Sequence, residues 1–151
     1  MQVIRGNIWD FHADGFPVVI TTNCELNSKG EAIMGKGIAL EAKRHFPGLP
    51  KMLGQHIKRF YSAVKYFPEF NLFIFPTKYN WREKSDLDLI CESSIGLDHI
   101  VYQKFNVCND SHFKKVYTVK PGCNNGQLNW EDVEEVLNRN LDKDRFIVVD
   151  N

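Results

Sequence analysis

Residues 23–47 read NCELNSKGEAIMGKGIALEAKRHFP, and this stretch decides the fold. A run of apolar residues at 17–22 precedes it and predicts a buried strand. The second half of the stretch has apolar side chains at four-residue spacing, which predicts a helix that begins near Gly37. This helix must end before Pro47, because proline cannot continue a helix. Its apolar face consists of Ile38, Ala39, Ala42 and Phe46.

The strand and the helix are joined by a glycine-bearing loop, residues 23–37, which we call the first loop. A glycine loop that opens a helix presents free backbone N–H groups and the positive end of the helix dipole. Such a site attracts anions. We therefore expect a phosphate-bearing ligand to lie over Gly35 to Gly37.

Two nucleotide-binding motifs match the first loop in part. Residues 30–36 fit the P-loop pattern G-x-x-x-x-G-K, but Gly37 stands where a magnesium-binding Ser or Thr should follow. The apolar run at residues 146–150 ends in an aspartate, as a second P-loop motif would, although a core strand explains it better. Gly35 and Gly37 also begin the dinucleotide pattern G-x-G-x-x-G, but Leu40 replaces its third glycine. Neither motif is complete.

The composition predicts a soluble globular protein with one domain spanning residues 1–151. Hydrophobic residues make up 43% of the chain and charged residues 25%, both ordinary values. Lysine plus arginine equals aspartate plus glutamate, at 19 each, so any contact with DNA must be local rather than driven by net charge. The four cysteines show no paired spacing, which predicts neither a zinc site nor a disulfide framework.

The start of the chain has no apolar signal-peptide region, and no stretch approaches the ~20 apolar residues of a membrane span. We therefore expect a cytoplasmic protein. The remaining sequence alternates between strand and helix patterns, which predicts an α/β fold. The expected strands lie at residues 2–5, 71–75, 113–119 and 146–149, and the expected helices at residues 49–64, from Ser85 and from Asn129.

Two of these helices carry start signals. Ser85 and Asp88 resemble a capping box, and Asn129 can cap the last helix. The helix at 49–64 is expected to have its apolar side chains on one face. These are Met52, Leu53, Ile57, Phe60 and Tyr61.

Three segments together resemble the macrodomains, the ADP-ribose-binding fold. More narrowly, they resemble the antitoxin macrodomains of the DarTG toxin–antitoxin systems, which remove ADP-ribose from DNA bases. The matching residues are Asn23, Met34 to Ala39, His45 to Pro47, Phe75 to Lys78, Trp81, Arg82, Ser85 and the pattern G-C-x-x-G-x-L-x-W at residues 122–130. This resemblance implies a three-layer α/β/α fold with a mixed, mostly parallel central sheet.

The resemblance also implies roles for individual residues. In the DarTG antitoxin group, and in the related terminal ADP-ribose glycohydrolase, the lysine that matches Lys78 is catalytic, and Asn23 would position the distal ribose. Asn7 stands where the family carries an acidic residue that meets the adenine amino group. A second glycine loop, residues 121–130, would wrap the second phosphate and the distal ribose. The residues expected to bind ADP-ribose are Asn7, Ile8, Asn23, Met34, Gly35, Lys36, Gly37, Ile38, Thr77, Gly122, Cys123, Asn124, Asn125, Gly126 and Leu128.

Three residues depart from the family pattern in or beside the second loop. Asn124 replaces a frequent glycine, and Lys120 replaces an apolar residue. Gly126 stands where terminal ADP-ribose glycohydrolase has a catalytic aspartate. The two-residue mechanism of that enzyme therefore does not carry over whole.

The function implied by the resemblance is hydrolysis of an ADP-ribose link, foremost on a nucleobase in single-stranded DNA. We expect no cofactor and no metal, a monomeric chain and an ADP-ribosyltransferase toxin as a possible partner. One alternative is a phosphatase acting on ADP-ribose 1''-phosphate. A second is a non-catalytic module that only binds ADP-ribose, and a third, more remote, is a P-loop kinase.

Overall fold

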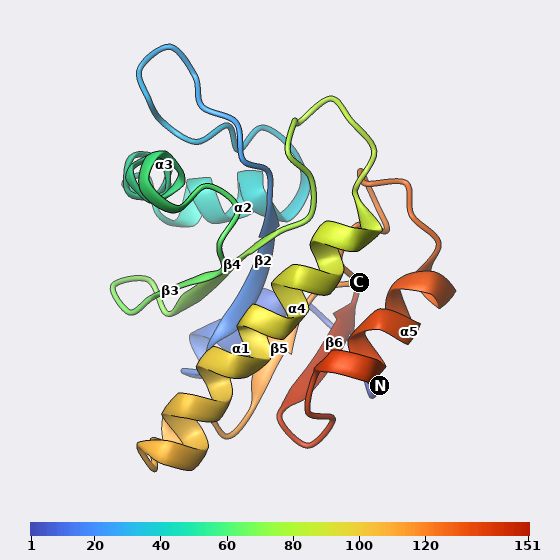
Figure 1. The fold of residues 1–151 in the computed structure, drawn as a ribbon. Helices are drawn as coiled ribbons and strands as arrows, with labels where there is room; N and C mark the ends of the chain where they lie inside the picture. The colour runs from blue at the N-terminus through green and yellow to red at the C-terminus, as the bar shows by residue number, and fades with distance from the viewer.

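The computed structural model describes all residues, Met1–Asn151, which form one six-stranded sheet with helices on both faces (Figure 1). The strands follow the order β1-β6-β5-β2-β4-β3, and β3 alone is antiparallel to its neighbour. This arrangement confirms the mixed, mostly parallel sheet. The strands are β1 (Val3–Arg5), β2 (Val18–Thr22), β3 (Lys65–Phe67), β4 (Leu72–Pro76), β5 (Val116–Thr118) and β6 (Phe146–Asp150).

Five α-helices cover the two faces of the sheet. They are α1 (Ile8–Ala13), α2 (Gly37–His45), α3 (Leu49–Phe60), α4 (Leu87–Tyr102) and α5 (Trp130–Asn140). A π-helical turn, η1 (Gln103–Val107), continues α4, and a 3₁₀ turn, η2 (Ser111–Phe113), precedes β5. No helix is both long and apolar enough to cross a membrane.

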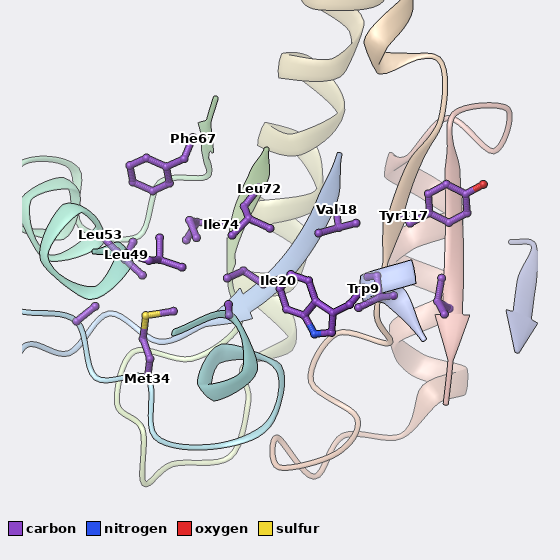
Figure 2. Close-up of a cluster of buried hydrophobic side chains, with 14 of the residues drawn as sticks. Trp9, Val18, Ile20, Met34, Leu49, Leu53, Phe67, Leu72, Ile74 and Tyr117 are labelled. Atoms are coloured by element: carbon purple, nitrogen blue, oxygen red, sulfur yellow. The ribbon is translucent and has the colours of Figure 1, made fainter. Parts of the chain in front are cut away.

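The first face of the sheet is covered by α1, α2 and α3, whose buried side chains join one apolar cluster with β2 and β4. Figure 2 shows Trp9 of α1 and Met34 of the first loop beside Ile20 and Ile74 of the strands. Ala42 of α2 is fully buried there, as the four-residue spacing predicted. Burying one large apolar side chain contributes about 1.5–3 kcal/mol, so this cluster fixes α2 and the first loop against the sheet.

The opposite face is covered by α4 and α5, which lie against each other (Figure 1). Ile90, Leu97 and Val101 of α4 meet Val133 and Leu137 of α5 in a second buried cluster. The two clusters on either side of the sheet confirm the three-layer α/β/α architecture. They also explain why β4 is buried at every position, since both of its faces are covered.

Two local expectations are wrong. Asp86, and not Ser85, caps α4, because its Oδ1 accepts from the backbone N–H groups of Asp88 and Leu89 at 2.9 and 3.2 Å. The helix expected at 49–64 ends at Phe60, since Tyr61 has a positive φ of 51°.

Two aromatic side chains at the end of α3 lie outside the core. Phe60 and Tyr61 are 56% and 51% exposed, although the sequence predicted them on the buried face. In contrast, Asn129 caps α5 as expected, through the N–H of Glu131 at 3.2 Å. The helix α1 and the strand β3 were not anticipated at all.

Candidate functional site

The site forms where three neighbouring parallel strands end. β5, β2 and β4 lie side by side, so their carboxyl ends meet at one edge of the sheet. The second loop follows β5, the first loop follows β2, and residues 77–86, here called the lysine loop, follow β4. Figure 1 shows the three loops at the same end of the molecule. Ligands of open α/β sheets collect at such strand ends.

Backbone hydrogen bonds join the three loops into one unit. Cys24 N donates to Tyr79 O at 3.3 Å, which connects the first loop to the lysine loop. Ser85 N donates to Gly126 O at 2.9 Å, which connects the lysine loop to the second loop. The lysine loop is therefore hydrogen-bonded to both of the other loops.

A cavity of about 450 Å³ opens among these loops, a size typical of small-molecule sites. Its charged side chains are three lysines and a single carboxylate, Glu41, so the lining favours an anionic ligand. The expected site residues that line it are Asn7, Ile8, Asn23, Gly35, Lys36, Gly37, Ile38, Thr77, Lys78, Gly122, Asn124, Asn125 and Gly126.

Three expected ligand-binding residues do not line the cavity. Met34 is only 2% exposed and belongs to the first apolar cluster. Cys123 and Leu128 pack against the second cluster beneath the second loop. Burial raises the pKa of the Cys123 thiol, and its Sγ donates to Pro121 O at 3.4 Å. These three side chains support the loops from below.

Lys78 leaves the end of β4 and lies half-buried in the cavity wall. Loss of hydration lowers the pKa of its ammonium group below the usual 10.5, and the charge of Lys36 lowers it further. Both causes destabilise the charged form. Lys78 is therefore a stronger acid than a lysine on the surface, which suits a group that gives up a proton during a reaction.

The amide of Asn23 holds the first loop in shape. Its Nδ2 donates to Ile33 O at 3.0 Å, and its Oδ1 accepts from Glu25 N at 2.9 Å. One Nδ2 hydrogen remains for a ligand, since an amide nitrogen carries two. Asn23 thus has a structural function whatever else it contacts.

Asn7 and Ile8 form the far wall of the cavity, where α1 begins. Asn7 is the N-cap of α1, and its Oδ1 accepts from Trp9 N at 3.0 Å. An amide oxygen has two lone pairs, so a second acceptor position is left for an adenine amino group.

Two glycines mark close approaches between the loops. Gly37 has a φ of +57°, and a Cβ there would lie 2.8 Å from Nδ2 of Asn125 in the second loop. At Gly126, a Cβ would lie 2.5 Å from Gly122 O and even closer to Ser85 Oγ. A side chain does not fit at Gly126 without rearrangement of the loop, so this position has no room for an aspartate.

The sequence analysis did not identify several residues that line the cavity. Thr22 Oγ1 and Ser85 Oγ are buried in the cavity wall without a hydrogen-bond partner in the protein. A buried polar group without a partner in the protein is completed by an ordered water or by an atom of a ligand. The position of Thr22 at a strand end was a usable signal. The other residues missed were Thr21, Ile33, Ala39, Glu41, Trp81, Val119, Lys120, Val149 and Asn151.

The last strand does not support the P-loop interpretation. Asp150, which would hold the metal, forms an ion pair with Lys120 at 3.0 Å. The rest of β6 is buried between β1 and β5, as a core strand should be.

Comparison with known sequences gives two curated relatives. Each is a DNA ADP-ribosyl glycohydrolase, from Mycobacterium bovis and Mycobacterium tuberculosis, with 33% identity over 136 residues. The match covers 83% of this chain but 34% of each relative, so the chain spans about a third of their length. No protein-family model matches the chain.

Comparison with solved structures gives macrodomains of DarG proteins and a DarTG. The macrodomain of Mycobacterium tuberculosis DarG has a TM-score of 0.67 at 25% identity and covers 99% of this chain and 98% of its own. The macrodomain of Thermus aquaticus DarG has a TM-score of 0.71 at 23% identity, with 99% and 97% covered. A Thermosipho africanus DarTG in complex with ADP-ribose has a TM-score of 0.70 at 20% identity, with 99% and 41% covered.

Proposed function

We propose a function from the premise that this chain belongs to the macrodomain family, as a macrodomain of the DarG type. The chain binds ADP-ribose in the cavity at the strand ends and hydrolyses the bond between ADP-ribose and a nucleobase of single-stranded DNA. The observation that carries this proposal is Lys78, held in the cavity wall with a lowered pKa.

The cavity offers a complementary group for each part of ADP-ribose. The diphosphate would lie against the backbone at Gly35 to Gly37, where α2 begins and the loops approach closely. The adenine would lie toward Asn7, and the distal ribose toward Asn23 and the lysine loop. The hydroxyls of Thr22 and Ser85, which have no partner in the protein, lie buried in the wall of the same cavity.

Lys78 would act on the departing base. Breaking an N-glycosidic bond leaves positive charge on the ribose and negative charge on the base as it departs. An ammonium beside the base stabilises the negative charge and donates the proton, after which water takes the base's place on the sugar. The neutral amine as a nucleophile is the alternative, but Gly126 leaves no aspartate in the second loop to assist it.

We also propose an oligomeric state, a partner and a location for the protein. Residues 1–151 would form one monomeric domain, and an ADP-ribosyltransferase toxin would be its partner, since the Thermosipho africanus neighbour is a DarTG. A DNA substrate would place the protein in the compartment that holds the DNA, which in a bacterium is the cytoplasm.

The test is release of ADP-ribose from a single-stranded oligonucleotide that carries one ADP-ribosylated base. We expect the protein to release ADP-ribose from this substrate and to leave ADP-ribose 1''-phosphate unchanged. Chromatography of the products separates the outcomes. Phosphate release from ADP-ribose 1''-phosphate alone would replace the proposal by a phosphatase, and tight binding of ADP-ribose without any hydrolysis would replace it by a reader module.

The pH dependence of kcat/KM tests the form of Lys78 that acts, because this parameter reports the free enzyme. If the ammonium is the active form, the rate is lost as pH rises through the pKa of Lys78. Because that pKa is lowered, the loss should begin at a lower pH than an ordinary lysine would give. Lys36→Ala removes one cause of the lowering and should move the alkaline limb to higher pH. A rate that increases with pH in this range would indicate the nucleophilic amine instead.

A further inference from the structure

We propose that exposed aromatic side chains beside the cavity hold the single-stranded DNA that flanks the modified base. The residues are Tyr61, Tyr79 and Trp81, here called the aromatic patch. The inference rests on the proposed function, because the strand that it concerns is the one attached to an ADP-ribose in the cavity.

The patch is built from two segments that are distant in sequence. Tyr79 and Trp81 belong to the lysine loop, one and three residues after Lys78, and Tyr61 follows the end of α3. The rings of Tyr61 and Tyr79 stack with centroids 5.7 Å apart and planes 17° apart. They are nevertheless 51% and 36% exposed, so the core does not explain their presence.

Trp81 is the residue of the patch that lines the cavity. It is one of the cavity-lining residues, and its backbone N–H donates to Oε2 of Glu25 in the first loop at 3.2 Å. A chain that leaves the cavity beside Lys78 meets Trp81 at the wall, and Tyr79 lies two residues before Trp81 on the same loop.

Positive charge accompanies the Trp81 ring. Lys36 Nζ lies 5.6 Å from the centre of the Trp81 ring, and Arg82 Cζ lies 5.0 Å from it. Residues 78–84 contain three basic side chains and one acidic one, in a chain that is neutral overall. The cations beside Trp81 match the phosphates of a nucleic acid, whereas the charges that act on the two tyrosines include the carboxylates of Glu83, Asp86 and Glu92.

Aromatic rings interleaved with cations suit a single strand better than other acceptors. Every unpaired base offers a face for stacking, and each stacked base adds about 5- to 150-fold in affinity, while the bases of a duplex are already stacked on each other. A modified protein side chain has no comparable planar groups next to the acceptor. The cavity itself has the volume of a small-molecule site, which leaves the flanking nucleotides outside it.

The experiment compares Tyr61→Ala and Tyr79→Ala with Tyr61→Phe and Tyr79→Phe. The phenylalanine variants keep the stacking surface and remove only the hydroxyl, and at residue 61 both replacements bear the same positive φ. Tyr102→Ala, at an equally exposed tyrosine on α4, is the control for loss of surface area. The substrates are an ADP-ribosylated oligonucleotide of about eight nucleotides and the corresponding ADP-ribosylated nucleoside.

We expect the alanine variants to lose about 5- to 150-fold in kcat/KM on the oligonucleotide. Their kcat/KM on the nucleoside and their affinity for free ADP-ribose should stay within about twofold of the parent. In the phenylalanine variants and in Tyr102→Ala, the same two quantities should also stay within about twofold of the parent. An equal loss on both substrates, or a matching loss on an ADP-ribosylated peptide, would overturn the proposal, because the tyrosines would then support the cavity or hold any acceptor.

Binding of the unmodified oligonucleotide, followed by fluorescence anisotropy at low salt, separates this inference from the proposed function. Weaker binding by the alanine variants supports the patch even if the parent hydrolyses nothing. Arg82→Ala should reduce the slope of log affinity against log salt by about 0.7, the value for one phosphate contact on a single strand. No measurable binding by the parent, or equal binding by all variants, refutes the patch.

Discussion

Replacing Lys78 by alanine is expected to lower the release of ADP-ribose from modified single-stranded DNA about 100-fold or more. General acid–base catalysis contributes on this scale, which corresponds to about 2.7 kcal/mol or more of the activation free energy. The affinity for ADP-ribose should change only a few-fold, because the free ligand has no departing base for the ammonium to stabilise. Single-turnover release measures the first quantity, and calorimetric titration with ADP-ribose measures the second.

Two further substitutions sharpen the result. Lys78→Arg keeps a positive charge that does not release its proton, so it should recover only the part of the rate that comes from charge stabilisation. Lys43→Ala, at an exposed lysine of α2 outside the cavity, should leave the rate unchanged. Equal hydrolysis by the parent and Lys78→Ala would remove Lys78 from the mechanism.

Replacing Gly37 by valine is expected to abolish most of the binding of ADP-ribose. The positive φ of Gly37 costs a β-branched residue about 1–3 kcal/mol, and its Cβ would press on Asn125 in the second loop. Both effects disturb the backbone where the diphosphate should lie. We expect a loss of affinity of about 5- to 150-fold, the range that such a cost corresponds to.

Thermal unfolding with ADP-ribose measures this loss. At about 100 times its Kd a ligand adds ~2.7 kcal/mol to the parent, which is roughly 5–10 °C for a chain of this size. At the same concentration a 100-fold weaker variant should shift by less than about 2 °C. Gly48→Val is the matched control, since Gly48 has open space around it and a negative φ.

Lys36→Ala distinguishes this site from a P-loop. A P-loop lysine contacts the phosphates directly and its loss would abolish binding, whereas here the Lys36 ammonium lies 5.6 Å from the Trp81 ring. We therefore expect Lys36→Ala to cost less affinity than Gly37→Val. The reverse order, or a thermal shift with Mg-ATP but none with ADP-ribose, would contradict the assignment of the first loop.

The sequence alone determined the elements that depend on local pattern. The apolar run of β2 and the four-residue spacing of α2 are visible without any partner, because a strand and a helix each repeat their buried face at a fixed period. The glycines of the two loops and Lys78 could be located from the sequence pattern together with the family resemblance. A glycine at a positive φ, such as Gly37, leaves a mark in the sequence because few other residues tolerate that conformation.

Other features depended on contacts between segments far apart in the chain. Ser85 looked like a helix cap, but its hydroxyl lies buried in the cavity because Asp86 caps α4 in its place. Met34 looked like a ligand-binding residue and lies in the core. Ser85 and Asp86 are adjacent and either could cap a helix, so the local sequence pattern does not show which of them caps α4. The local pattern likewise does not show whether Met34 lies in the core or contacts a ligand.

The order of the strands in the sheet determines where the cavity forms. The first loop, the lysine loop and the second loop are separated by tens of residues, and they meet only because β5, β2 and β4 are neighbours in the sheet. The same order places Tyr61 against Tyr79 and Gly126 against Ser85. A sequence with strong local periodicity specifies its strands, but their pairing is a property of the whole packed chain, since it depends on which faces bury each other.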